Sequence, residues 1–182
     1  NQLDTLSVHA GVKTDPLTGA VMTPIYATST YAHDRPGEHK GYEYSRSQNP
    51  TREVLENSIA ELESGYKAFA FASGVAAQTA VLDLLKPGDH VIAFDDLYGG
   101  TFRLFNEIKS KSSNIEFTFV DLNTNFSKEI KKNTKMIWIE TPTNPLLKIT
   151  DLKRIARIAR KNKLITVCDN TFATPYNQRP LE

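Results

Sequence analysis

Cysteine is almost absent from this chain, because its 182 residues contain only Cys168 and no internal disulfide can form. Disulfide-rich frameworks belong to oxidising compartments, so this composition predicts a cytoplasmic protein. No apolar run approaches the roughly 18 residues needed to cross a bilayer, and the amino end lacks the basic-then-apolar pattern of a secretion signal. We therefore expect no membrane partner and no export by that route.

The chain also lacks an excess of either charge, with 22 basic and 21 acidic residues and a formal net charge of +1. The two signs are interspersed, which disfavours nucleic acid as a partner and favours a small molecule. The four histidines show no ligand spacing, so no metal site is predicted. The G-x-G-x-x-G, Walker A and G-x-S-x-G fingerprints are missing, which removes the usual support for a dinucleotide-binding, nucleoside triphosphate or serine hydrolase function.

The first 48 residues follow neither the helical nor the strand period and are rich in Pro, Gly, Thr and Tyr. This pattern predicts an extended amino-terminal arm over 1–48. Ordering such an arm without burying it costs entropy, so we expect it to contact a neighbouring subunit. Asn49-Pro50 is a helix-start signal, and residues 49–182 are predicted to form the next domain.

Short apolar runs alternate with helical patterns beyond residue 66. The runs that have the length of strands buried on both faces are 67–72, 90–94, 115–120, 136–140 and 164–169. Helical patterns over 75–85 and 152–159 lie between them, and Thr150 is the expected N-cap of the second. This alternation predicts an α/β fold with a mostly parallel sheet and helices on both faces.

Polar residues follow these runs at the strand ends, where ligands bind in parallel sheets. Ser73-Gly74, between a strand and an Ala-rich helix, would let N–H groups at the helix start face a phosphate, although glycine is also common at such turns for steric reasons. Tyr98 precedes a glycine pair, which indicates either a close backbone approach or a surface turn. Glu140 and Asn144 belong to a loop stiffened by two prolines, which favours a binding loop.

Asp169 closes the last apolar run. A carboxylate at this position is costly to desolvate unless a cation, a proton or several donors meet it. Asn170 and Thr171 could be local donors, and the alternative is a ligand with a basic ring nitrogen that the carboxylate keeps protonated. A phosphate-binding turn, a stacking aromatic ring, an amide donor and a strand-end carboxylate together describe a planar, phosphorylated ring that contains nitrogen. Pyridoxal 5'-phosphate fits this description.

The motifs "GYEYSRSQNPTR", "FASGVAA", "DDLYGGTFRLF", "WIETPTNPLLKITD" and "VCDNTFATP" occur in that order. Together they resemble the Cys/Met-metabolism family of pyridoxal-phosphate enzymes within fold type I, and most of all its cystathionine γ-lyase and cystathionine γ-synthase branch. The resemblance implies transsulfuration chemistry, which is γ-elimination from cystathionine or γ-replacement on an activated homoserine with cysteine. Gly100 argues against the methionine γ-lyase branch, which looks to carry Cys there.

The resemblance also implies roles for individual residues. Tyr44 and Arg46 match a pair that reaches the cofactor phosphate of the neighbouring subunit, which requires at least a homodimer and implies a tetramer. Tyr98 and Asp169 are the catalytic predictions, the first as a stacking and proton-transferring phenol and the second as the partner of the ring nitrogen. The remaining predictions are Ser73, Gly74 and Val75 at the phosphate, Asn144 at the ring hydroxyl, Thr171 beside the ring, and Arg103 and Glu140 at the substrate.

The cofactor-tethering lysine is where this sequence departs from the family pattern. The resemblance places that lysine in a Ser-x-Thr-Lys stretch beyond Glu182, and Asn1 stands where a complete chain would have Met. We therefore expect residues 49–182 to be the amino-terminal part of the cofactor-binding domain, with the rest of that domain and the carboxyl-terminal domain absent. The 182-residue chain alone is then expected to be inactive, and the alternative hypothesis is a non-catalytic cofactor-binding or assembly fragment.

Overall fold

The structure is a computed structural model that describes residues 3–182. The chain divides into two compact units, one up to Ala70 together with Leu181–Glu182 and one from Phe71 to Pro180. None of the helices between residues 3 and 182 is both long and apolar enough to cross a membrane.

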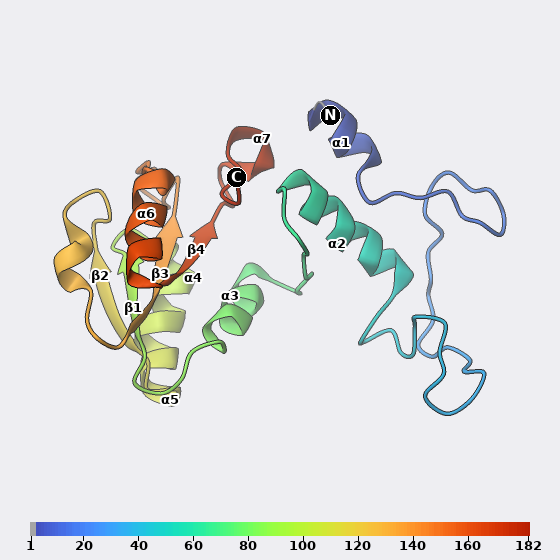
Figure 1. The fold of residues 1–182 in the computed structure, drawn as a ribbon, viewed down its shortest axis with the longest axis horizontal. Helices are drawn as coiled ribbons and strands as arrows, with labels where there is room; N and C mark the ends of the chain where they lie inside the picture. The colour runs from blue at the N-terminus through green and yellow to red at the C-terminus, as the bar shows by residue number, and fades with distance from the viewer. Residues whose placement is uncertain (1–2) are drawn as a thin grey trace. The chain divides into compact units, whose positions relative to one another are not determined.

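The first unit contains the helices α1 (Leu3–His9) and α2 (Pro50–Leu62), with irregular backbone between them (Figure 1). Helix α2 begins as predicted, because the Asn49 side chain accepts from the N–H groups of the first turn. Helix α1 corrects the prediction of an arm without helix over 1–48. Its half-buried residues, Leu3 and Leu6, and the buried Ala10 that follows the helix, have the three-and-four spacing of a helix in a stretch too short to stand out in the sequence.

Irregular backbone fills most of the arm between α1 and α2. Isolated bridges such as Thr30 with Tyr44 interrupt it. Arg52 of α2 holds its last part, because the guanidinium donates to the carbonyl oxygens of Ser45 at 3.0 Å and Ser47 at 2.8 Å. The last part of the arm is therefore held to the start of α2 by hydrogen bonds from the Arg52 side chain to carbonyl oxygens of the arm.

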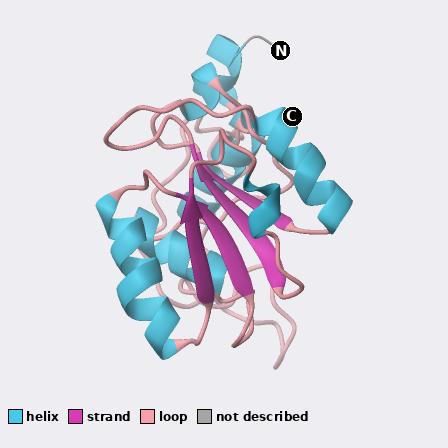
Figure 2. Ribbon diagram, turned by 90° about the vertical axis from the view of Figure 1, so that its left-hand side faces the viewer, coloured by secondary structure: helices cyan, strands magenta, loops and turns pink. Residues whose placement is uncertain are grey.

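The second unit is built on one sheet, whose four strands run in the order β2-β1-β3-β4 with every neighbouring pair parallel (Figure 2). The strands are β1 (His90–Phe94), β2 (Glu116–Val120), β3 (Thr134–Glu140) and β4 (Ile165–Asp169). Strand β1 lies between two others and is buried along its whole length, as its uninterrupted apolar sequence predicts. The predicted α/β fold with a parallel sheet is confirmed.

The run 67–72 was predicted as a strand, and this prediction is wrong for the described residues. The segment has no strand hydrogen bonding, and Phe69 and Phe71 are 66% and 48% exposed. An apolar run has the composition of a strand, but it becomes one only where a second strand supplies the hydrogen-bonded ladder. Within residues 3–182 no strand pairs with this segment.

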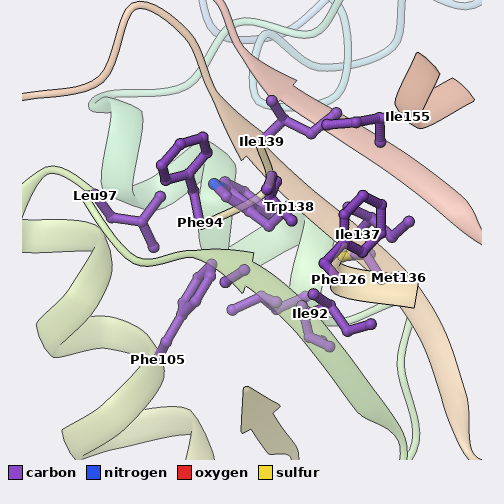
Figure 3. Packing of buried hydrophobic residues seen from close by; sticks show 14 of the residues in the cluster. Ile92, Phe94, Leu97, Phe105, Phe126, Met136, Ile137, Trp138, Ile139 and Ile155 are labelled. Atoms are coloured by element: carbon purple, nitrogen blue, oxygen red, sulfur yellow. The ribbon is translucent and has the colours of Figure 1, made fainter. Parts of the chain in front are cut away.

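Helices cover both faces of the sheet. Those of the second unit are α3 (Gly74–Leu82), α4 (Gly99–Arg103), η1 (Leu104–Lys109), α5 (Ser110–Ser112), η2 (Phe126–Glu129), α6 (Leu152–Asn162) and α7 (Thr174–Asn177). Trp138 of β3 packs edge-on against Phe105 of η1, with 5.0 Å between ring centroids. The next residue, Ile139, points to the opposite face, where Ile155 of α6 lies beside it (Figure 3). The two neighbours on β3 therefore face different helices.

The N-cap of α6 differs from the predicted one. Asp151, and not Thr150, caps the helix, because its carboxylate accepts from the N–H of Arg154 at 2.9 Å. Thr150 is buried and donates its own N–H to Thr141 Oγ1. Asp ranks above Thr as an N-cap residue, so the sequence "TD" itself favours Asp151.

Candidate active site

A cavity of about 340 Å³ lies at the carboxyl ends of β3 and β4. Glu140 and Asp169, the last residues of these strands, are partners in the parallel pairing. The predicted residues that line the cavity are Ser73, Gly74, Val75, Tyr98, Glu140, Asn144, Asp169 and Thr171. The fold thus brings together residues from four separate motifs at the strand ends, where a parallel sheet binds its ligands.

The start of α3 forms one wall of the cavity. Ser73 caps the helix, since its Oγ accepts from Ala76 N at 3.1 Å and its carbonyl accepts from Ala77 N at 3.1 Å. The first N–H groups, those of Gly74 and Val75, have no acceptor within the helix. A Cβ at Gly74 would meet nothing within 4 Å, and both Gly74 and Val75 line the cavity. This arrangement suits a phosphate group.

Tyr98 stands at the start of α4, and its side chain is 47% exposed. The glycine pair that follows it has a steric reason, because a Cβ at Gly100 would overlap the Tyr98 ring. The ring therefore lies over the backbone of its own helix start and faces the cavity with its remaining surface. A ring held in this way can stack on a planar ligand.

Glu140 is buried, with 4% of its surface exposed. Its carboxylate accepts the N–H of Tyr98, at 3.0 Å and 3.2 Å from the two oxygens, and the N–H of Asn144 at 2.8 Å. Burial raises the pKa of the Glu140 carboxyl, and these hydrogen bonds oppose the rise. Glu140 lines the cavity, while a contact between its carboxylate and a substrate stays a prediction.

Donors meet Asp169 from two directions. Thr171 donates its N–H to Oδ1 at 3.2 Å and its hydroxyl to the same oxygen at 2.5 Å. Gln78 of α3 donates from Nε2 to Oδ2 at 3.4 Å. Of the two predicted local donors, Thr171 contacts the carboxylate, whereas the Asn170 amide donates to the carbonyl oxygen of Gln178. Local donors and a cavity-facing carboxylate are therefore both present at this strand end.

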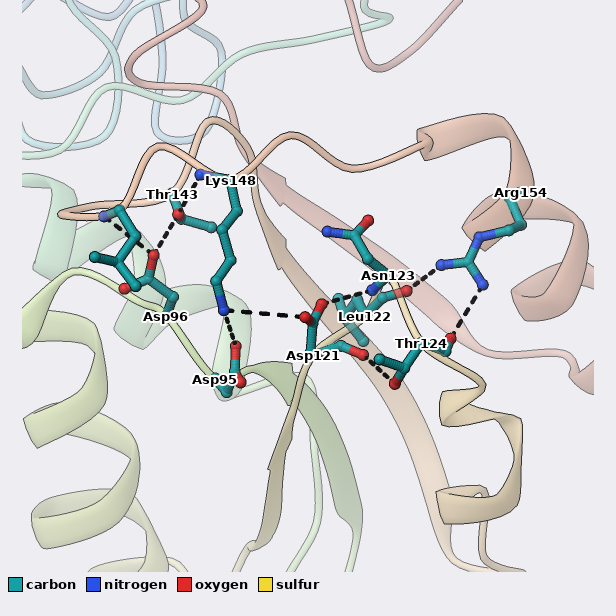
Figure 4. Close-up of polar contacts among 10 residues, drawn as sticks. Asp95, Asp96, Asp121, Leu122, Asn123, Thr124, Thr143, Lys148 and Arg154 are labelled. Carbon is teal, nitrogen blue, oxygen red and sulfur yellow. Dashed lines mark hydrogen bonds and ion pairs between the residues drawn. The ribbon is translucent and has the colours of Figure 1, made fainter.

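The loops that follow β1 and β3 are joined to each other by polar contacts (Figure 4). The Thr143 hydroxyl donates to Asp96 Oδ2 at 2.5 Å, and the same Thr143 oxygen accepts from Lys148 N at 2.8 Å. Lys148 Nζ lies 3.3 Å from Asp95 Oδ1 and 4.0 Å from Asp121 Oδ2. The loop that carries Asn144 is therefore attached to the ends of both β1 and β2.

Three predicted site residues are not among those that line the cavity. Tyr44 and Arg46 belong to the first unit, where the Arg46 guanidinium lies 4.8 Å from the centre of the Tyr44 ring. Arg103 is exposed on α4. Their roles at the phosphate and at the substrate stay predictions.

Gln78, Pro142 and Phe172 line the cavity but were not predicted from the sequence. Gln78 is 8% exposed and exchanges hydrogen bonds with Thr101 of α4, from Nε2 to Oγ1 at 2.9 Å and from Oγ1 to Oε1 at 3.1 Å. The available signal was a single long polar side chain inside the small-residue helix "GVAAQTAVL", one turn after Gly74. A helical position one turn inside a phosphate-binding start shares its face with that start.

The lining chemistry fits pyridoxal 5'-phosphate. Helix-start N–H groups next to open space suit the phosphate, the Tyr98 ring suits the pyridine face, and the Asp169 carboxylate suits a protonated ring nitrogen. A volume of about 340 Å³ is within the usual range for small-ligand sites. Among residues 3–182, no cluster of His, Cys, Asp or Glu side chains is arranged to hold a metal ion.

Comparison with known proteins agrees with this chemistry. A cystathionine beta-lyase from Coxiella burnetii is 56% identical over 184 residues, which cover 100% of this chain and 48% of that protein. A probable cystathionine gamma-synthase from Herpetosiphon aurantiacus is 50% identical over 179 residues, which cover 97% of this chain and 56% of that protein. The crystal structure of cystathionine gamma-lyase from Lactobacillus plantarum, complexed with L-serine, matches with a TM-score of 0.95 at 46% identity. The match covers 100% of this chain and 48% of that one.

The chain spans about half the length of the curated relatives it matches. Residues 4–182 match the family model described as Cys/Met metabolism PLP-dependent enzyme. The family predicted from the motifs is confirmed, and it implies pyridoxal 5'-phosphate as the cofactor. The chain belongs to the Cys/Met metabolism family of PLP-dependent enzymes.

Proposed function

We propose that this protein is a transsulfuration enzyme that breaks or forms a carbon–sulfur bond with pyridoxal 5'-phosphate. Its substrates are cystathionine, by elimination, or an activated homoserine plus cysteine, by γ-replacement. The observation that carries the proposal is the convergence of the α3 start, Tyr98, Asn144 and Asp169 on one cavity at the strand ends. The names of the similar proteins, which are cystathionine lyases and synthases, support the substrate class.

Each lining residue has a role that follows from its chemistry. When bound, the cofactor supplies an electron sink for a carbanion at the substrate Cα. The N–H groups of Gly74 and Val75 bind the phosphate, and Asn144 donates to the ring hydroxyl. Asp169 keeps the ring nitrogen protonated, and Thr171 and Gln78 hold this carboxylate in its orientation. The Tyr98 phenol stacks on the ring and carries a proton to or from the reacting substrate.

We propose a homo-oligomer, at least a dimer and in the complete protein a tetramer, that works in the cytoplasm. The support from the structure is the number of apolar side chains that the arm exposes, since Leu17, Val21, Met22 and Ile25 are 73–90% exposed. Several large apolar side chains exposed within one short segment favour a protein–protein contact. In this arrangement Tyr44 and Arg46 of one subunit reach the cofactor phosphate of the other.

Product analysis tests the proposed function. The purified, cofactor-loaded full protein is incubated either with cystathionine or with an acylated homoserine plus cysteine, and the products are identified by mass spectrometry. Cysteine with 2-oxobutyrate and ammonia indicates γ-elimination, and cystathionine formed from the second mixture indicates γ-replacement. Homocysteine with pyruvate and ammonia indicates β-elimination. Tight cofactor binding without any of these products would favour the non-catalytic cofactor-binding alternative.

A further inference from the structure

Glu140 is a charged residue that the fold buries at the edge of the cavity, with 4% of its surface exposed. A carboxylate in such a place is tolerated only where donors meet it. It ends β3 on the same face as Trp138, and its neighbour across the strand pair is Asp169. The Asp169 carboxylate accepts hydrogen bonds from the side chains of Gln78 and Thr171. The buried Glu140 carboxylate also needs hydrogen-bond donors.

The donors to Glu140 are backbone N–H groups from two different loops. Tyr98 N lies 3.0 Å from Oε2 and 3.2 Å from Oε1, and Asn144 N lies 2.8 Å from Oε1. Tyr98 precedes α4, and Asn144 lies in the loop after β3, so neither N–H belongs to a helix or strand ladder. One oxygen atom therefore joins two segments that are far apart in the sequence.

Both anchored residues line the cavity. A backbone N–H that loses a buried acceptor either stays unsatisfied or shifts toward water. Because a binding group must be held within about 0.5 Å of its productive position, such a shift would misplace Tyr98 and Asn144 together.

The same contacts argue against a direct substrate contact for Glu140. Three accepted hydrogen bonds occupy most of the roughly four acceptor sites of a carboxylate. Burial raises the pKa of the Glu140 carboxyl, and the charges of Asp169 and Asp96 raise it further, while the Tyr98 and Asn144 hydrogen bonds lower it. The two loop amides are thus the groups that favour the ionised carboxylate in this site.

We propose that Glu140 is a positioning residue, whose buried carboxylate sets the Tyr98 and Asn144 loops relative to each other before the cofactor binds. The inference rests on the proposed function for the meaning of these two side chains. The hydrogen bonds from Tyr98 and Asn144 to Glu140 do not depend on the proposed function, because they are present in the cofactor-free protein.

Amide hydrogen exchange in the cofactor-free full protein tests the proposal. Wild type is compared with Glu140→Ala and Glu140→Gln. We expect the amides of Tyr98 and Asn144 to exchange about 10- to 100-fold faster in Glu140→Ala. The Gln side chain of Glu140→Gln keeps one acceptor oxygen, but its NH₂ group faces one of the two backbone N–H groups and cannot accept from it. The amide exchange rates of this variant should therefore lie between those of wild type and Glu140→Ala. Cofactor affinity, from an absorbance titration with pyridoxal phosphate, should fall about 3- to 10-fold in parallel.

Glu116→Gln is the matched control, because it makes the same chemical change at an exposed carboxylate at the other end of the sheet. It should leave exchange at Tyr98 and Asn144 unchanged. If Glu140→Ala does not fold, the exchange rates of the Tyr98 and Asn144 amides in Glu140→Gln test the proposal. Wild-type exchange at both amides in Glu140→Gln, or equal acceleration over the whole sheet, would overturn the proposal. Lack of activity both on cystathionine and on an acylated homoserine plus cysteine would refute the proposed function and leave the exchange result standing.

Discussion

The two carboxylate oxygens of Asp169 accept hydrogen bonds from different residues. Oδ1 accepts from Thr171, and Oδ2 accepts from Gln78. Hydrogen bonding to both oxygens fixes the plane of the carboxylate. A fixed, ionised carboxylate at the cavity is the arrangement needed to keep a ring nitrogen protonated. At the scale of the residue, the function of this site therefore depends on charge and orientation together.

Replacing Asp169 by Asn separates charge from shape. The amide keeps the size of the side chain and can still accept from Thr171, but it cannot hold a proton on the ring nitrogen. Hydrogen bonds to charged groups are worth about 1.5–3 kcal/mol, so kcat/KM of the full protein should fall by about 10- to 150-fold. Steady-state kinetics on the substrate identified by product analysis measures this loss.

Asp83→Asn provides the comparison, because Asp83 is an exposed carboxylate outside the cavity that pairs with Lys109. It should keep wild-type kinetics. Circular dichroism should show that both variants remain folded. Near-normal turnover in Asp169→Asn would contradict the role of the charge.

Several site residues could be predicted because their residue type and neighbouring sequence indicate their role. Ser73 and Gly74 form a helix start, and Asp169 is a carboxylate at the end of an apolar run. Gln78 and the orientation of Glu140 were not predictable, since their partners are amides and carboxylates from other elements. Such contacts depend on how loops meet in three dimensions, which periodicity and spacing do not describe.

His90 connects three strands at the amino end of the sheet. Its ring nitrogens lie 2.8 Å from Thr134 Oγ1 on β3 and 2.9 Å from Thr118 Oγ1 on β2, and the side chain is fully buried. Burial lowers the pKa of His90 below its ordinary value of 6.5, and the charge of Lys131 adds to this effect. At the scale of the element, β1 is held to both neighbours by a neutral imidazole.

The sheet should therefore lose stability in acid. A group whose pKa is lowered in the folded state contributes stability above its unfolded pKa, and this contribution is lost as the pH falls from about 6.5 through the folded value. His90→Gln should flatten the pH dependence of the free energy of unfolding between about pH 7 and pH 5. At neutral pH it should also cost about 1–3 kcal/mol, because a buried partner is left unsatisfied.

Urea unfolding of the cofactor-free protein at several pH values measures both effects. His39→Asn is the control, since His39 is exposed in the arm and should leave the slope as in wild type. If His90→Gln retained the wild-type pH dependence, another group would have to be responsible.

Elements were predictable where the sequence carries its own periodicity. Strand β1 and the start of α2 agree with their predicted positions because burial and capping are local signals. The segment 67–72 failed because a strand needs a partner that its own residues do not specify. The short helix α1 was missed because one or two turns give too few residues for a period to appear.

At the scale of the whole molecule, the proposed oligomer makes one active site from two chains. Asp169 lines the cavity of the second unit, and Arg46 lies in the first unit. If Arg46 serves the partner's site, then each site of a dimer contains one Arg46 and one Asp169 from different copies. Two defective chains can then combine into one intact site.

Co-expression of Arg46→Ala and Asp169→Asn tests this arrangement. Each variant alone should be inactive or nearly so, but a mixed dimer has one site with both changes and one with neither. With random pairing, half of the dimers are mixed and one of their two sites is intact, so activity should recover to on the order of one quarter of wild type. The activity of the unseparated mixture measures this recovery, and a mixed dimer isolated by its two tags should reach about one half of the wild-type activity.

Two differently tagged copies of Asp169→Asn should show no recovery. An inactive mixed dimer of the two different variants would indicate that Arg46 acts within its own chain or away from the phosphate.

The hydrogen bonds to Glu140 come from the main chain alone. Every amino acid except proline supplies the same N–H at positions 98 and 144, so Glu140 does not depend on which side chains these loops carry. Substitutions in the two loops can therefore alter what the cavity recognises while the backbone stays attached to β3. A protein built in this way can acquire a new substrate preference through single replacements, without first evolving a new means of holding its loops.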